Sequence, residues 1–212
     1  MDPDFWHAKW ERNEIGFHIG EVNPLLVAHF DALALAPGSR LFLPLCGKTL
    51  DIHWLLARGH RVVGAELSRL AVQQLFAELG LAPTVSREGD LEHFAAGNLD
   101  IYVGDIFDLT PARVGAVDAV YDRAALVALP ENVRPRYTSH LRGITGEAPQ
   151  LLICFEYDQS RHAGPPFSVD ADEVRRHYAR HFTLTRLDHV DVVGGLKGKC
   201  PAKESVWLMR RA

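Results

Sequence analysis

The segment from residue 40 to residue 66 contains a glycine turn and an acidic residue that together could hold a nucleoside. The buried-strand run RLFLPL breaks between Pro44 and Gly47, and a helical pattern follows. Such a turn exposes backbone N–H groups at the start of the helix, and Gly47 lacks the Cβ that would block a ligand. Glu66 ends the next apolar run, 19 residues after Gly47. This spacing is typical of a carboxylate that accepts hydrogen bonds from both ribose hydroxyls, so the segment predicts an adenosine pocket.

Polar residues also follow the next two apolar runs. In GDIFDL, Asp105 could accept a hydrogen bond from an exocyclic amine, and Ile106 could cover the face of a purine. Asp122 and Arg123 end the run VDAVYDR. Each residue alone also fits a plain explanation, namely a turn, a core side chain, a surface arginine or a buried ion pair. Their recurrence after four successive runs indicates a site at one edge of a sheet.

The elements that must position these residues alternate between strand and helix patterns from residue 40 onward. Alternation of this kind predicts a mostly parallel sheet with helices on both faces, so that the carboxyl ends of its strands share an edge. The last two runs have no helix between them, which predicts an antiparallel hairpin. We expect seven strands within residues 40–45, 60–67, 99–109, 117–129, 150–158, 182–193 and 204–211. We expect helices at 49–59, 68–80, 131–145 and 170–180, the second of them capped by Ser68.

The first 39 residues form a distinct lead-in with an aromatic, amphipathic start and a later helix announced by Asn23 and Pro24. We expect residues 1–212 to form a single domain in which residues 1–39 cap the site. At 212 residues the chain is long enough for one large domain, and 47% apolar residues are typical of a globular protein.

Charge and cysteine content argue against several classes of protein. The net charge of −4 lacks the basic excess of a nucleic-acid binder, and no uninterrupted apolar stretch suggests a signal peptide or a membrane span. Three widely spaced cysteines without a CxxC pair predict neither a disulfide framework nor a zinc cluster, and we expect no metal. We therefore expect a cytoplasmic, monomeric protein that acts on a small molecule.

Several segments, in order and across nearly the whole chain, resemble the thiopurine S-methyltransferase family. They are FWHAKWERNEIGFH, LPLCGKTLDIHWLLARGHRVVGAELS, GDIFDL, YDRAALVALP and GPPFSV. The PLCGK turn takes the place of the glycine-rich loop usual in class I methyltransferases. The resemblance implies a Rossmann-like class I methyltransferase fold, S-adenosyl-L-methionine as cofactor with S-adenosyl-L-homocysteine as product, and transfer of a methyl group to the sulfur of thiopurines and related aromatic or heterocyclic thiols.

The resemblance also implies roles for individual residues. Arg123, with Asp122 beside it, would face the acceptor as the catalytic pair, and Phe17 and His18 would line the acceptor pocket with Arg123. Toward the C-terminus, the segment VVGGLKGKCPAKESVW departs from the basic pattern of animal members, so Lys197 and Lys199 receive no role. The residues implied to contact the cofactor are Trp6, Trp10, Leu45, Gly47, Glu66, Asp105, Ile106 and Arg123.

Three alternatives share the same residues. The acceptor could be a selenium or tellurium species or another small thiol. A nucleotide-binding regulator or an NAD-dependent oxidoreductase could also place an acid at Glu66, although an oxidoreductase would be expected to carry the glycine-rich turn that PLCGK lacks. A binding module without activity is the third, and Arg123 and the aromatic lead-in weigh against it.

Overall fold

The computed structural model describes residues 3–212, except for the side chain of Glu88, so residues 1–2 of the expected cap lie outside the described part. Its helices are α1 (Pro3–Glu11), α2 (Pro24–His29), α3 (Leu50–Ala57), α4 (Arg69–Glu78), α5 (Pro111–Val114), α6 (Arg134–Thr145) and α7 (Ala171–Tyr178). Short 3-10 helices are η1 (Phe30–Leu33), η2 (Ile106–Asp108), η3 (Leu126–Ala128) and η4 (Gln159–Arg161). The strands are β1 (Arg40–Leu43), β2 (Arg61–Glu66), β3 (Thr84–Glu88), β4 (Leu91–Ala96), β5 (Leu99–Val103), β6 (Ala119–Arg123), β7 (Gln150–Tyr157), β8 (Phe182–Asp191) and β9 (Ala202–Arg211).

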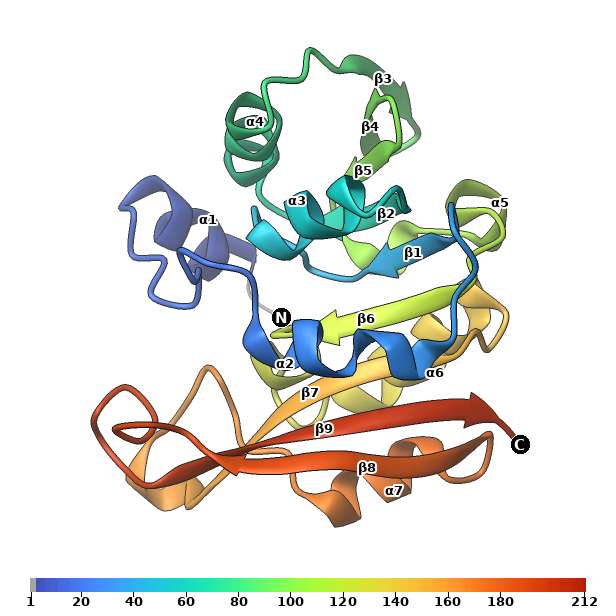
Figure 1. The fold of residues 1–212 in the computed structure, drawn as a ribbon. Coiled ribbons are helices and arrows are strands. Elements are labelled where there is room, and N and C mark those ends of the chain that lie inside the picture. Colours follow the sequence, from blue (N-terminus) through green and yellow to red (C-terminus); the bar gives the residue numbers. More distant parts are fainter. Residues whose placement is uncertain (1–2) are drawn as a thin grey trace.

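All of these strands belong to one sheet with the order β3-β4-β5-β2-β1-β6-β7-β9-β8 (Figure 1). The five central strands, from β5 to β7, run parallel to one another. The strand β9 is antiparallel to both β7 and β8, which confirms the predicted hairpin at the end of the chain. The Rossmann-like α/β fold is therefore confirmed, with β1 near the middle of the sheet.

The strand count is nine rather than the seven expected, because β3 and β4 form an additional hairpin before β5. Both strands are antiparallel to their neighbours, and their connection passes through Gly89 and Asp90. A Gly–Asp pair between two short alternating segments is itself a hairpin signal, so the sequence carried the information. The hairpin extends the sheet away from the central strands and leaves their order unchanged.

Two apolar clusters, one on each face, hold the helices against the sheet. Helices α5, α6 and α7 pack on one face through Val114, Leu141 and Val174, among others. Helices α3 and α4 cover the other face through Ile52 and Leu75. Burial of such side chains contributes about 1.5–3 kcal/mol each, which fixes both layers around the strand ends.

Helix boundaries follow the predicted caps. The side chain of Asn23 accepts hydrogen bonds from the N–H groups at the start of α2, and Ser68 accepts one from Ala71 at the start of α4. Thr49 caps α3 directly after the turn that follows β1. Because α3 starts where β1 ends, its first turn faces the edge at which the parallel strands terminate.

The N-terminal helix α1 lies beside that edge, next to the ends of β1 and β6 (Figure 1). Trp10 is its one buried residue among those described, whereas Phe5 is 39% exposed. No helix of the described chain is both long and apolar enough to cross a membrane. Within residues 3–212 there is also no group of three or more His, Cys, Asp or Glu side chains that could hold a metal ion.

Candidate active site

A cavity of about 640 Å³ opens at the carboxyl ends of β1, β2 and β6. This volume lies within the range of small-molecule sites, and an open parallel sheet binds ligands at this edge. The wall combines residues of the lead-in, the turn after β1, the end of β6 and two loops near the C-terminus. Of the residues predicted for the site, the cavity wall contains Trp6, Trp10, Phe17, His18, Leu45, Gly47, Glu66 and Arg123.

Glu66 connects the end of β2 to the turn after β1. Its carboxylate accepts hydrogen bonds from the N–H groups of Gly47 at 2.7 Å and Ser68 at 2.8 Å. Burial raises the pKa of Glu66, and the backbone N–H groups of Ser68, Gly47 and Leu67 oppose that rise. A carboxylate has about four acceptor sites, so Glu66 retains capacity for a ligand hydroxyl beside these N–H groups.

Gly47 is needed at this turn for a reason that the sequence did not show. Its φ of +55° lies in the left-handed region, and a Cβ there would lie 3.1 Å from a ring atom of Trp10. The sequence explained Gly47 by the approach of a ligand, but in the structure the nearest group is the indole of Trp10 in the lead-in. In this way the turn and α1 fit against each other directly.

Asp105 and Ile106 lie just beyond the end of β5, beside Glu66, but they do not line the described cavity. The N–H of Gly104 donates to the carbonyl of Glu66 at 3.0 Å, which fixes this proximity. Asp105 is exposed, and its carboxylate accepts from the N–H of Phe107. Ile106 is buried. The two residues flank the site on the Glu66 side.

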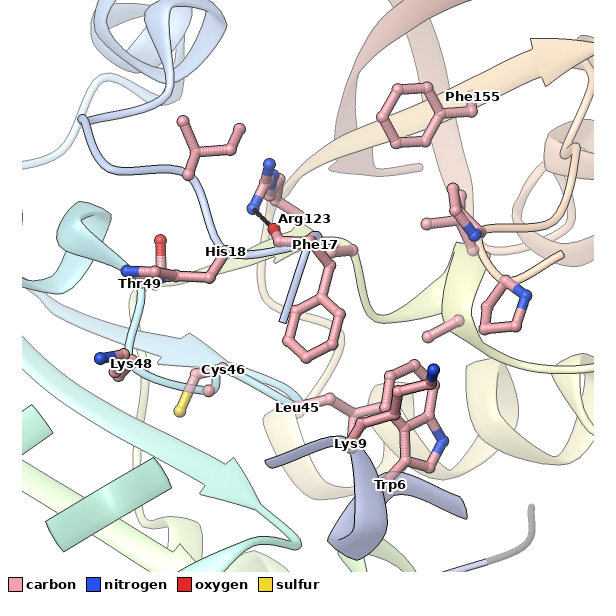
Figure 2. A pocket seen from close by; sticks show the side chains of 18 of the residues that line it. Trp6, Lys9, Phe17, His18, Leu45, Cys46, Lys48, Thr49, Arg123 and Phe155 are labelled. Atoms are coloured by element: carbon pink, nitrogen blue, oxygen red, sulfur yellow. Dashed lines mark hydrogen bonds between the residues drawn. The ribbon is translucent and has the colours of Figure 1, made fainter. Parts of the chain in front are cut away.

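Arg123 ends β6 and projects into the cavity with Phe17 (Figure 2). Its guanidinium donates to the carbonyl of Phe17 at 3.4 Å, and it forms no ion pair with the described carboxylates. The ring of Phe17 meets those of Trp6 and Trp10 edge to face, each at a centroid distance of 5.6 Å. The lead-in thus contributes an aromatic wall next to a permanent positive charge.

Three non-glycine residues of the wall have a positive φ. One of them is Lys197, with a φ of 49°, in the loop near the C-terminus. Leu45, after β1, has a φ of 46°, and Ala124, after β6, has a φ of 67°. Non-glycine residues in this region cost about 1–3 kcal/mol each and concentrate at functional sites. Leu45 and Ala124 lie within two residues of the end of a parallel strand at the cavity, as expected of a site built into the sheet edge.

Asp122 lies on the opposite face of the sheet from Arg123 and does not line the cavity. It is fully buried, and it accepts hydrogen bonds from the Tyr137 hydroxyl at 2.6 Å and from the N–H of Leu126 at 3.1 Å. Burial raises the pKa of Asp122 to about 6. Successive side chains of a strand point to opposite faces of the sheet, so Asp122 and Arg123, as neighbours in β6, cannot both face the cavity. The structure therefore does not bring the Asp122 side chain into the cavity.

Sequence reasoning missed Asp51 and Tyr121, which both line the cavity and are almost fully buried. The Tyr121 hydroxyl donates to the Asp51 carboxylate at 3.0 Å, and the N–H of Asn23 donates to its other oxygen at 2.8 Å. An acidic residue four positions after Gly47 was visible in the sequence. Its pairing with Tyr121, 70 residues away, depends on β6 lying next to β1.

Two loops near the C-terminus complete the wall opposite the turn. Gly164, Pro165 and Pro166 belong to one of them, and the Lys197 ammonium of the other donates to the Pro165 carbonyl at 3.1 Å. At Gly164, φ is +84°, and a Cβ would lie 2.5 Å from the ring of Phe167. No sequence signal beyond the GPPFSV segment identified this wall.

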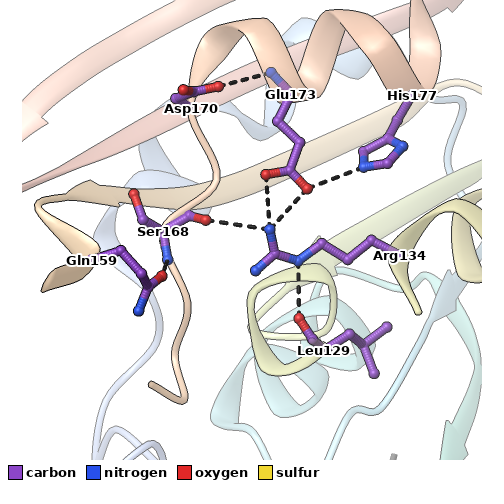
Figure 3. A network of polar contacts seen from close by, with 7 residues as sticks. All are labelled: Leu129, Arg134, Gln159, Ser168, Asp170, Glu173 and His177. Carbon is purple, nitrogen blue, oxygen red and sulfur yellow. Dashed lines mark hydrogen bonds and ion pairs between the residues drawn. The ribbon is translucent and has the colours of Figure 1, made fainter. Parts of the chain in front are cut away.

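A buried ion pair anchors the proline loop (Figure 3). Arg134 of α6 donates to both carboxylate oxygens of Glu173 of α7 at 2.8 Å, and it also donates to the Ser168 carbonyl at 3.3 Å. Burial alone would raise the pKa of Glu173, but hydrogen bonds from His177 and Arg134 outweigh it and lower that pKa. The network links two helices to the loop that closes the cavity.

Comparisons with known proteins identify relatives over the whole chain. A family model described as thiopurine S-methyltransferase matches residues 1–212. A thiopurine S-methyltransferase of Xanthobacter autotrophicus is 58% identical over 213 residues, which cover 100% of both chains. One of Gluconobacter oxydans is 50% identical over 96% of this chain and 92% of its own.

Solved structures of lower identity share the fold. The 1,6-didemethyltoxoflavin-N1-methyltransferase of Burkholderia thailandensis, solved with S-adenosylhomocysteine, superposes with a TM-score of 0.68 at 15% identity and covers 99% of this chain and 87% of its own. The magnesium protoporphyrin IX methyltransferase of Synechocystis gives 0.64 at 16% identity, over 99% of this chain and 100% of its own.

The family model and the relatives, on a fold shared with solved methyltransferases, define an S-adenosylmethionine-dependent methyltransferase. The residues present fit that cofactor, because Glu66 keeps acceptor capacity at the cavity and the wall is mostly apolar, with several aromatic rings. Within this class, the chain belongs to the thiopurine S-methyltransferase family. This assignment favours S-adenosylmethionine over the nicotinamide cofactor and over the inactive binding module considered from the sequence.

Proposed function

We propose that the protein transfers the methyl group of S-adenosylmethionine to the sulfur of thiopurines and related aromatic or heterocyclic thiols. The family's name supports this acceptor class. In the structure, the proposal is carried by one observation: the Arg123 guanidinium lies in the cavity next to aromatic rings and forms no ion pair with a described carboxylate. Its charge acts on the carboxyl group of Glu204 only by opposing the rise of that pKa on burial. A flat, anionic sulfur compound matches both features.

The cofactor would occupy the side of the cavity near Glu66. S-adenosylmethionine supplies a methyl group on a positively charged sulfur, already activated for transfer. We assign the ribose hydroxyls to Glu66, and the adenine to Asp105 and Ile106, which adjoin Glu66 through the Gly104 hydrogen bond. Leu45, Gly47, Trp6 and Trp10 would pack against the remainder.

The acceptor would enter from the side of Arg123. Aromatic heterocyclic thiols ionise more readily than alkyl thiols, and a fixed positive charge favours the thiolate further. Burial first, and the charge of Lys48 second, lower the pKa of His18, so its imidazole is neutral near pH 7 and adds no competing charge. Phe17 and the tryptophans exclude water, which keeps the thiolate reactive.

Two further assignments concern support of the site. Residues 1–39 would act as a cap within a single domain, since Trp6, Trp10 and Phe17 all line the cavity. Asp122 would act as a positioning residue, because it holds Leu126 of η3 and Tyr137 of α6 behind the end of β6. A small-molecule partner, a monomeric state and a cytoplasmic location belong to the same proposal.

The test is steady-state kinetics of Arg123→Ala with a thiopurine. We expect kcat/KM to fall by one to two orders of magnitude, about 1.4–2.7 kcal/mol, because the thiolate loses its counter-charge. Arg175→Ala, which removes an exposed arginine on α7, is the matched control and should keep the wild-type value. An unchanged kcat/KM in Arg123→Ala would remove Arg123 from the mechanism.

A panel of acceptors tests the substrate class. Aromatic and heterocyclic thiols should be methylated faster than aliphatic thiols at the same pH, since more of each is present as thiolate. A preference for selenium or tellurium species over every thiol would support the alternative acceptor and contradict the proposal.

A further inference from the structure

The cavity wall contains a buried carboxylate without a cationic partner. Of the carboxylates that line the described cavity, Glu14 pairs with the Lys9 ammonium at 2.5 Å, and Glu66 accepts from two backbone N–H groups. Asp51 is 1% exposed, and the partners found for it, Asn23 N–H and Tyr121 O–H, are both neutral. A buried carboxylate held by neutral donors is suited to receive a cation from a ligand.

The geometry leaves room for such a bond. Each oxygen of Asp51 accepts one hydrogen bond and can accept a second. The two donors come from the residue before α2 and from β6, so the carboxylate is held from two sides. Charge-assisted hydrogen bonds to a carboxylate that is already positioned are among the strongest in proteins.

S-adenosylmethionine carries two positive groups, the sulfonium and the α-ammonium of its methionine portion. Methyl transfer removes the charge of the sulfonium. An anion against it would therefore stabilise the ground state more than the transition state and would slow the reaction. The ammonium keeps its charge throughout, so a carboxylate can bind it without opposing transfer.

We propose that Asp51, held by Tyr121 and the backbone of Asn23, binds the α-ammonium of the cofactor. This inference rests on the placement of the cofactor in the cavity that we proposed above. Asp51 also ties α3 to β6 and to the start of α2, which is a structural role. The test must therefore separate the loss of a ligand contact from the loss of rigidity.

The experiment is titration calorimetry of the full chain and Asp51→Asn with three ligands. S-adenosylmethionine carries both positive groups, S-adenosylhomocysteine only the ammonium, and 5′-methylthioadenosine neither. We expect Asp51→Asn to weaken the first two equally, by about tenfold or more, and to leave the third within about twofold. Asp31→Asn is the control, because it removes the same charge from an exposed carboxylate beside Arg58, beyond the other end of α3. It should leave the affinity for all three ligands unchanged.

Other outcomes would overturn the assignment. Weaker binding of all three ligands would mean a structural role, and weaker binding of S-adenosylmethionine alone would place the carboxylate at the sulfonium. Tyr121→Phe keeps the charge of Asp51 and should retain the preference for S-adenosylhomocysteine over 5′-methylthioadenosine. Loss of that preference would mean that the Tyr121 hydroxyl, and not the carboxylate, recognises the ammonium. Wild-type protein that binds none of the ligands would refute the cofactor site itself, whereas normal wild-type binding with unaffected Asp51→Asn would refute only the role of Asp51.

Discussion

The buried carboxyl group of Asp122 should make the stability of this protein depend on pH. Burial raises its pKa to about 6, against an ordinary value of 3.8. The folded state therefore binds more protons than the unfolded state between about pH 4 and pH 6, and the free energy of unfolding falls as the pH rises through this window. The full difference corresponds to roughly 3 kcal/mol, of which about 1.4 kcal/mol falls between pH 5 and pH 7.5.

Asp122→Asn should abolish this contribution, because the amide does not titrate. The Asn amide can accept from the Leu126 N–H and donate to the Tyr137 hydroxyl oxygen, which reverses the direction of the present bond to Tyr137. The reversal adds an offset of at most about 1 kcal/mol that does not vary with pH. The free energy of unfolding of both proteins is measured by urea unfolding at pH 5 and pH 7.5, followed by tryptophan fluorescence. The difference between the two proteins is then compared at the two pH values, so the contributions of other titrating groups cancel.

Equal pH dependence in the two proteins would refute the reasoning, since it would mean that the carboxyl group of Asp122 titrates alike in the folded and unfolded states. Activity gives an independent check of its position. If Asp122 supports the site from behind, Asp122→Asn should reduce kcat much less than Arg123→Ala does. A comparable loss would return Asp122 to the chemistry, as the sequence first suggested.

Two further substitutions test how the wall is held. Gly47→Ala places a Cβ against Trp10 on a left-handed backbone and should lower the free energy of unfolding. The loss should exceed that of Gly80→Ala, whose backbone is similar but whose surroundings are open, by about 1–2 kcal/mol. Equal urea midpoints of the two variants would contradict the contact with Trp10. Glu173→Ala leaves the buried Arg134 guanidinium without its carboxylate and should lower the free energy of unfolding, measured by thermal unfolding, by about 3–5 kcal/mol. Asp172→Ala, at an exposed neighbouring residue, should lower it by less than about 1 kcal/mol. Similar losses in the two variants would show that the network does not stabilise the fold.

Much of the fold could be predicted from local sequence patterns. Asn23 and Ser68 cap their helices as expected. Such caps can be predicted from sequence because the side-chain oxygen and the N–H groups that it accepts from are only a few residues apart. Glu66 and Arg123 lie at one edge because parallel strands place their carboxyl ends together, and they reach one cavity because β2 and β6 both flank β1. The hairpin before β5 was missed although its turn signal was present.

What the sequence determined by itself was the alternation of strands and helices, and hence the edge of the sheet at which the candidate site lies. Only the tertiary structure decided which side chains share that edge. The bond between Tyr121 and Asp51 spans 70 residues and the one between Arg123 and Phe17 spans 106. Such contacts depend on strand order and on the path of the lead-in, which are set by packing of the whole core rather than by any short segment.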